Sequence, residues 1–186
     1  RTGPVGLALR PRGLSGPAVA MRFLETVETL DYADCPWSGE GRDVGLYQAW
    51  RPGRIAFARA WPHPTPLVES GAMASVSPPA PTYRPTLPVG LRGEGRLSDA
   101  QAETVVYAGE AHAALLPGWW LPGEAAHDLR LAAEDAEGAF QLRRGMFLGD
   151  GTGAGKGRQI AAVIADNIAA GRVRAVWLSK NEALLE

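Results

Sequence analysis

Cysteine, histidine and long apolar runs are scarce in this sequence, and each scarcity excludes a class of protein. The single cysteine, Cys35, excludes an internal disulfide framework and a four-cysteine zinc site, and it fits a reducing compartment. The three histidines show no metal-ligand spacing with that cysteine, so these residues predict no metal site. No run approaches the roughly 18 apolar residues that cross a bilayer, and no secretory signal opens the chain, which predicts a cytoplasmic protein without membrane contact.

An excess of charge of either sign is also lacking, because 19 basic and 20 acidic residues leave a net charge of −1. A nucleic-acid surface, if the protein has one, must therefore be local. Glycine and proline are instead abundant, at 23 and 15 of 186 residues, against roughly 12% expected for the two together. The first residue is not methionine and the last residues begin a helical pattern, so we expect a piece of a longer protein.

Composition divides the chain into three parts. Residues 1–46 predict a flexible lead-in or linker, with a short helix at 20–30. Residues 47–96 are rich in proline and predict extended segments that wrap over a neighbouring domain without building a sheet, apart from one strand at 54–60. Residues 97–186 predict the start of an α/β domain.

The first strong helix is predicted at residues 97–116. Ser98 followed three residues later by Gln101 is typical of a capping box, and Pro117 ends the pattern. The apolar positions at helical spacing predict the buried face. They are Val105, Val106, Ala113 and Leu116.

A strand, a glycine-rich loop, a helix and a second strand are predicted near the end of the chain. The strands are expected at 145–149 and 173–179, and the helix at 156–170, with Gly171 as its C-terminal stop. The helix carries an apolar row at steps of four, formed by Ile160, Ile164 and Ile168. This order is the βαβ unit of an open parallel sheet, so the predicted fold class is α/β.

The loop between the first strand and the helix is FLGDGTGAGKGR, Phe147–Arg158. A helix N-terminus after glycines presents free N–H groups and the positive end of the helix dipole, and a lysine there adds a charge for the β and γ phosphates. Lys156 stands at that position. The general phosphate-loop pattern is met imperfectly, because Asp150 replaces the first glycine and Gly157 replaces the hydroxyl residue that normally holds magnesium.

The same letters also satisfy a dinucleotide fingerprint through Gly149, Gly151 and Ala154. That alternative requires an acidic residue at the end of the second strand, where Ser179 and Lys180 stand instead. A loop that binds the phosphates of a nucleotide, which we call the phosphate cradle, is therefore favoured over the dinucleotide site. A glycine loop that binds nothing is the third alternative. The tryptophans beside arginines could stack bases, but packing of the proline-rich segments is the favoured interpretation.

With these features, the sequence resembles the strawberry notch family, helicase-like P-loop ATPases of superfamily 2. The resemblance covers roughly Tyr47–Glu186 and lies in RRGMFLGDGTGAGKGRQIAAVIADNIAAGRVRAVWLSKN, HPTPLVESGAMASVSPPAPTYRPTLP and LSDAQAETVVYAGEAHAALLP. It implies a RecA-like lobe and ATP bound with Mg²⁺, and it implies that Lys156 is the catalytic residue. The residues implied to contact the nucleotide are Gly151, Thr152, Gly153, Ala154, Gly155, Lys156, Gly157 and Arg158.

Two further roles follow from the resemblance. Gln101 resembles the glutamine that reads adenine in many such ATPases, although its role in the capping box is an equal alternative. Residues 175–180 resemble a segment that approaches the nucleic-acid backbone in relatives. For Lys180 the favoured alternative is a solvent-exposed charge that makes no phosphate contact. Eukaryotic members of the family are nuclear transcription co-regulators. Because the composition here suggests a bacterial source, we expect this protein in the cytoplasm, and in the nucleus only if its source is eukaryotic.

Hydrolysis by such ATPases also requires an acidic motif on a later strand and an arginine from a second lobe. Only 30 residues follow Lys156, so we expect this chain alone to bind ATP without turning it over. Most magnesium ligands are expected elsewhere in the parent protein, and Thr152 is the nearest hydroxyl. The parent is expected to remodel nucleic acid or nucleoprotein. The alternatives are a nucleotide-gated interaction module without translocation and, more distantly, an oxidoreductase domain.

Overall fold

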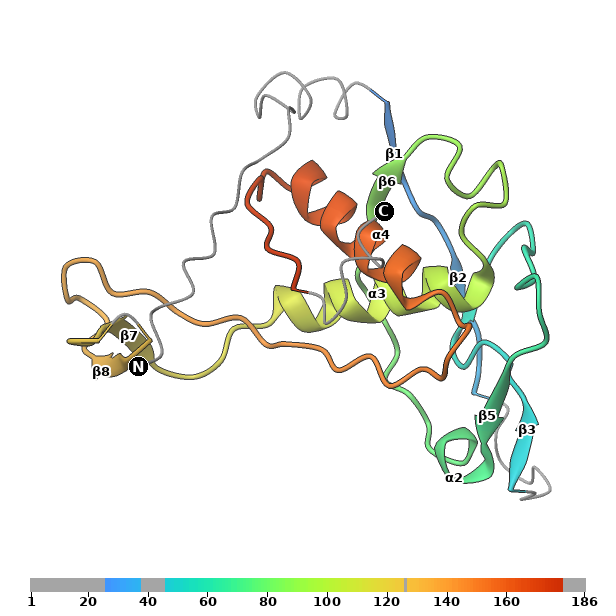
Figure 1. The fold of residues 1–186 in the computed structure, drawn as a ribbon, viewed down its shortest axis with the longest axis horizontal. Coiled ribbons are helices and arrows are strands. Elements are labelled where there is room, and N and C mark those ends of the chain that lie inside the picture. Colours follow the sequence, from blue (N-terminus) through green and yellow to red (C-terminus); the bar gives the residue numbers. More distant parts are fainter. Residues whose placement is uncertain (1–25, 38–45, 126, 179–186) are drawn as a thin grey trace, which may run out of the picture.

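In the computed structural model, two helices lie side by side and short pairs of strands surround them (Figure 1). The structure describes residues 26–37, 46–125 and 127–178. The helices are α3, Asp99–Ala113, and α4, Lys156–Ala169. Within the described residues no helix is long and apolar enough to cross a membrane.

Helix α3 begins where the sequence predicts. Ser98 is its N-cap, with the Ser98 hydroxyl accepting from the Gln101 N–H at 3.4 Å and the Gln101 side chain accepting from the Ser98 N–H at 3.0 Å. This reciprocal pairing confirms the capping box. The helix ends at Ala113, earlier than predicted. Val105 and Val106 are buried as expected, but Ala113 and Leu116 are not, because they lie at and beyond the end of the helix.

Helix α4 follows the glycine loop and ends before Gly171, as predicted. Gly171 has a φ of +82°, the left-handed conformation that terminates helices. The predicted isoleucine row is not the most buried face, since Ile160 is 39% exposed. The buried residues of α4 are instead Gln159, Ala162 and Asp166. Polar side chains therefore form most of the buried face of α4.

Within the described part of the chain, the strands form four antiparallel pairs. Strand β1, Val27–Thr29, pairs with β6, Thr86–Pro88, with Glu28 opposite Leu87. The other pairs are β2, Ala33–Asp34, with β4, Ile55–Ala56; β3, Tyr47–Ala49, with β5, Val68–Ser70; and β7, Trp119–Pro122, with β8, Leu129–Ala132. A short helix, α2, Gly71–Ala74, follows β5. The β7–β8 hairpin lies apart from the two helices (Figure 1).

These pairs correct two predictions for the first half of the chain. The helix predicted at 20–30 is wrong over 27–29, because those residues form β1 and pair with β6; residues 20–25 lie outside the described part. The proline-rich segment does build one strand pair of its own among the described residues, β3 with β5, and its predicted strand at 54–60 is reduced to β4. Pairing partners distant in sequence decide both outcomes.

The predicted βαβ unit is not formed within the described residues. Residues 145–149 and 173–178 form no strand, and Ser179 lies outside the described part. Phe147 and Leu178 are 92% and 90% exposed. A strand exists only where a neighbour accepts and donates its backbone hydrogen bonds, and no described segment pairs with either of these two. The described fold is thus a mixture of helices and small antiparallel sheets.

The core lies between α3, α4 and strands β4 and β6. Its buried members come from all three parts that composition suggests. They are Leu30, Tyr32, Ile55, Leu87, Leu97, Ala102, Val105, Val106 and Ala162. The proline-rich segments therefore pack directly onto the helices, while the boundaries at 46 and 96 stay a prediction.

Candidate phosphate-binding site

The glycine loop runs from Asp150 into the first turn of α4. Gly153 and Gly155 have φ values of +92° and +78°, left-handed conformations that side chains with a Cβ rarely adopt. Gly155 is the N-cap of α4 and has no side chain with which to cap the helix. The first turn of α4 therefore depends on something other than a cap side chain to satisfy its N–H groups.

The backbone N–H groups of the loop are the main feature of this site. Among the described residues, none accepts a hydrogen bond from the N–H groups of Gly151 to Gly157. The first bonded N–H of the helix is that of Arg158, which donates to the Gly155 carbonyl at 2.9 Å. Free donors at a helix N-terminus carry the positive end of the helix dipole and suit an anion.

Lys156 lies across the loop. Its Nζ donates to the carbonyl oxygens of Asp150 and Gly151, both at 2.9 Å. No described carboxylate forms an ion pair with Lys156. The ammonium charge is held beside the free N–H groups by neutral carbonyl oxygens, which an anion could replace as its partner.

Two buried glutamines hold the loop at opposite ends. Gln159, on α4 and 1% exposed, donates its Nε2 to Asp150 Oδ2 at 2.8 Å. Gln101, on α3 and 2% exposed, donates its Nε2 to the Ala154 carbonyl at 3.1 Å. The Oε1 of Gln159 has no hydrogen-bond partner in the described protein. The loop is thus fastened to both helices, although no sequence motif marks Gln159.

Gln101 has the role in the capping box that its sequence position predicts, and it also contacts the loop. A Cβ added at Gly155 would overlap the Nε2 of Gln101. The contact between Gln101 and Ala154 spans 53 positions, so no local pattern could reveal it. The adenine contact implied by the resemblance stays a prediction.

Asp166 anchors the end of α4 to the proline-rich segment. Its carboxylate is 2% exposed and accepts from the Tyr83 hydroxyl at 2.7 Å and from the Thr86 N–H at 2.8 Å. Burial, and then the hydrogen bond to Asp166, raises the pKa of Tyr83 to about 12. This anchor fixes α4, and with it the loop, against strand β6. Spacing in the sequence does not predict it.

A magnesium site is not complete in the described residues. They contain no group of three histidine, cysteine, aspartate or glutamate side chains that could hold a metal ion. Gly157 has no hydroxyl, and the carboxylate of Asp150 is already engaged by Gln159. Thr152 is exposed, and no described residue accepts a hydrogen bond from its hydroxyl. The residues present fit the phosphates of a nucleotide but not a full Mg²⁺ site.

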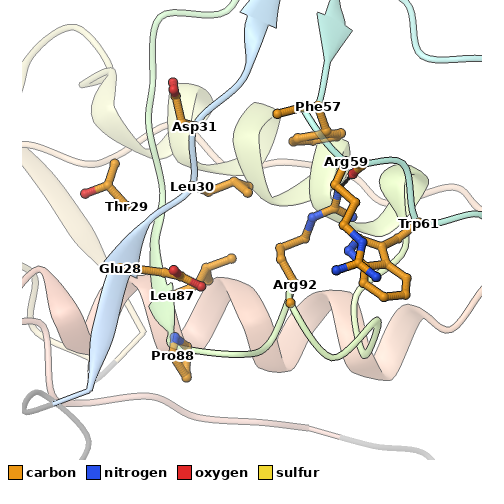
Figure 2. Close-up of a pocket in the computed structure, with 12 residues that line it drawn as sticks. Glu28, Thr29, Leu30, Asp31, Phe57, Arg59, Trp61, Leu87, Pro88 and Arg92 are labelled. Carbon is orange, nitrogen blue, oxygen red and sulfur yellow. Dashed lines mark hydrogen bonds between the residues drawn. The ribbon is translucent and has the colours of Figure 1, made fainter.

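A separate pocket of about 240 Å³ lies between the β1–β6 pair and the segment after β4 (Figure 2). In it the guanidinium of Arg92 stacks over Phe57 at 4.3 Å and donates to Asp99 at 2.7 Å. Arg59 stacks over Trp61 at 4.2 Å. No residue of the glycine loop lines this pocket, so it belongs to the packing of the proline-rich segment rather than to the loop.

The residues brought together are thus the predicted loop from Gly151 to Arg158 and, from α3, Gln101. Lys180 and Ser179 lie outside the described residues, whereas residues 175–178 are described and are exposed. Trp177 approaches the start of α4, where a Cβ at Gly157 would lie 3.9 Å from its ring.

Comparison with known proteins finds relatives that carry the same region. The family model for a P-loop containing NTP hydrolase pore-1 domain matches residues 62–186. A strawberry notch homolog of Caenorhabditis elegans is 35% identical over 138 residues, 74% of this chain and 6% of that protein. FORGETTER 1 of Arabidopsis thaliana is 36% identical over 141 residues, 75% of this chain and 9% of that protein.

A human protein, strawberry notch homolog 2, is 36% identical over 122 residues, 66% of this chain and 7% of that protein. This chain therefore spans less than a tenth of the length of these three relatives. No solved structure matches it. On the match to the domain model and the similarity to these proteins, the chain belongs to the P-loop containing NTP hydrolase pore-1 family and is strawberry notch-like.

Proposed function

We propose that the loop from Gly151 to Arg158 binds the phosphates of ATP. The observation that carries the proposal is the run of free N–H groups at the start of α4, beside which carbonyl oxygens hold the ammonium of Lys156. On binding, Lys156 exchanges its two carbonyl partners for phosphate oxygens, and the loop N–H groups donate to the same anion. Arg158 adds a second positive charge in the first turn of the helix.

The chain's own part in the chemistry is binding and orientation. Lys156 offsets the negative charge that gathers on the γ-phosphate and is the residue we assign to catalysis in the parent protein. Magnesium would supply positive charge that offsets the charge of the phosphates, and most of its protein ligands would lie outside these residues. We also propose that the parent protein is a helicase-like ATP hydrolase with a RecA-like lobe that remodels nucleic acid or nucleoprotein, as the resemblance implies.

Binding of ATP to the chain with Lys156→Ala tests the phosphate cradle. Isothermal titration calorimetry should show ATP and inorganic tripolyphosphate both binding to the wild type, and both losing about tenfold or more in affinity in the variant, since one charge-assisted hydrogen bond is lost. Arg130→Ala removes an exposed positive charge from β8 and is the matched control, which should bind as the wild type does. Equal affinities for wild type and Lys156→Ala would contradict the proposal.

Two further measurements separate the alternatives. A dinucleotide site would bind NADH more tightly than ATP, so a competition between the two decides that question. In the full-length parent, ATP hydrolysis stimulated by single-stranded DNA or RNA is expected for a motor. ATP binding without such stimulation would favour a nucleotide-gated interaction module instead.

A further inference from the structure

Both polar atoms of the Gln101 amide are engaged within the protein. The Oε1 accepts from the Ser98 N–H and the Nε2 donates to the Ala154 carbonyl. The side chain is 2% exposed. The amide retains a second N–H and a second lone pair, but because the side chain is buried a nucleobase reaches neither unless Gln101 moves, and moving it would break the bonds to Ser98 and Ala154. Gln101 is therefore poorly available to a ligand.

The bond to Ala154 has a geometric consequence for the loop. The described peptide bonds are all trans, and in a trans peptide the C=O and the next N–H point in opposite directions. Because the Ala154 carbonyl points to Gln101 on α3, the Gly155 N–H must point away from Gln101. That N–H belongs to the run of free donors that the proposed function assigns to phosphate.

Gly155 is suited to this arrangement in two ways. Its φ of +78° is left-handed, and a Cβ would overlap the Gln101 amide nitrogen. Gln101 can thus lie against the loop only because residue 155 has no side chain. The peptide between Ala154 and Gly155 is held by a buried neighbour on one side and is free on the other.

From these contacts we propose that Gln101 is a positioning residue that orients the phosphate cradle and does not read the base. The site then takes the polyphosphate of a nucleoside triphosphate, and Gln101 confers no preference for adenine. This inference rests on the proposed function, because it concerns the orientation of the same N–H groups. It replaces the adenine contact that the resemblance implies for Gln101.

The test compares three ligands that differ only beyond the phosphates. ATP, GTP and inorganic tripolyphosphate are titrated into the wild-type chain, Gln101→Glu and Gln101→Leu. The glutamate variant retains an acceptor for the Ser98 N–H but places a second oxygen against the Ala154 carbonyl, while the leucine variant retains neither bond. We expect all three ligands to lose affinity by about the same factor, roughly tenfold, which is the effect of one misplaced hydrogen-bond donor.

Ser98→Ala is the control for a general loosening of α3. It removes the hydroxyl half of the capping box but leaves the bond from Gln101 to Ala154, so thermal stability should fall while the three affinities stay near those of the wild type. A loss confined to ATP in the Gln101 variants, with GTP and tripolyphosphate unaffected, would overturn the inference and support base reading.

NMR relaxation of the backbone amides keeps the inference separate from the proposed function. If the wild type binds none of the three ligands, the phosphate proposal fails, and the ¹⁵N order parameters of Ala154 and Gly155 still test whether Gln101 holds the loop. Lower order parameters in both Gln101 variants than in Ser98→Ala support a positioning role. Unchanged order parameters in the Gln101 variants refute it.

Discussion

Replacing Asp166 by alanine should destabilise the protein strongly. The buried carboxylate accepts two hydrogen bonds, at 2.7 Å from the Tyr83 hydroxyl and at 2.8 Å from the Thr86 N–H. Each hydrogen bond to a charged group contributes about 1.5–3 kcal/mol, and alanine leaves both donors without a partner. The expected loss in the free energy of unfolding is about 3–5 kcal/mol, a large part of the roughly 5–15 kcal/mol of a typical domain.

Urea denaturation followed by tryptophan fluorescence and circular dichroism measures this loss. Asp166→Asn is the matched variant, because its amide oxygen still accepts from the Thr86 N–H while its NH₂ group can donate to the Tyr83 oxygen. It should lose only about 1–2 kcal/mol. A loss below about 1 kcal/mol for Asp166→Ala, or equal losses for the two variants, would refute the claim that this carboxylate anchors α4 to β6.

Three other substitutions test separate parts of the structure. Burial raises the pKa of Glu103 from 4.5 to about 7, so the folded protein keeps a proton that the unfolded chain releases, and stability falls as pH rises through that window. The free energy of unfolding of Glu103→Gln should therefore exceed that of wild type by up to about 3 kcal/mol at pH 8 and equal it near pH 4.5. Urea denaturation midpoints at the two pH values measure the difference. In Gly157→Ser the new side chain has room beside Trp177 and supplies the hydroxyl after the lysine. Adding Mg²⁺ should therefore raise the ATP affinity of this variant about tenfold more than it raises that of wild type. An equal effect of Mg²⁺ on the two proteins in calorimetry would contradict this. Gly109→Ala places a Cβ into the ring of Tyr83 and should cost about 1–3 kcal/mol, with an unchanged melting temperature as the contrary result.

Signals carried by a few neighbouring residues predicted where α3 begins and where α4 begins and ends. The start of α3 depends on Ser98 and Gln101, which are three residues apart, and the end of α4 depends on Gly171. Both are contacts within one turn, so the residues that make them are adjacent in the sequence as well as in space. The start of α4 at Lys156 was predicted for the same reason.

The strands and the buried faces were predicted poorly. Residues 27–29 form a strand because residues 86–88 lie beside them, and residues 145–149 form none because no described neighbour pairs with them. The apolar row that includes Ile160 suggested one face of α4, whereas the structure buries the face of Gln159 and Asp166. Buried polar groups are stable only with partners, and those of Asp166 lie far away in the sequence.

The sequence by itself determined the glycine loop, its lysine and the helix that follows, because glycine conformation, the helix dipole and a single charge are properties of consecutive residues. Only the tertiary structure decided how that loop is held. The Ala154 carbonyl is turned toward Gln101 across 53 positions, and Asp166 fixes the far end of α4 to residues 80 and 83 positions away. Such contacts form only when segments distant in the sequence come together. The buried hydrogen bonds that offset the conformational entropy lost in this step leave no pattern in the spacing of residues.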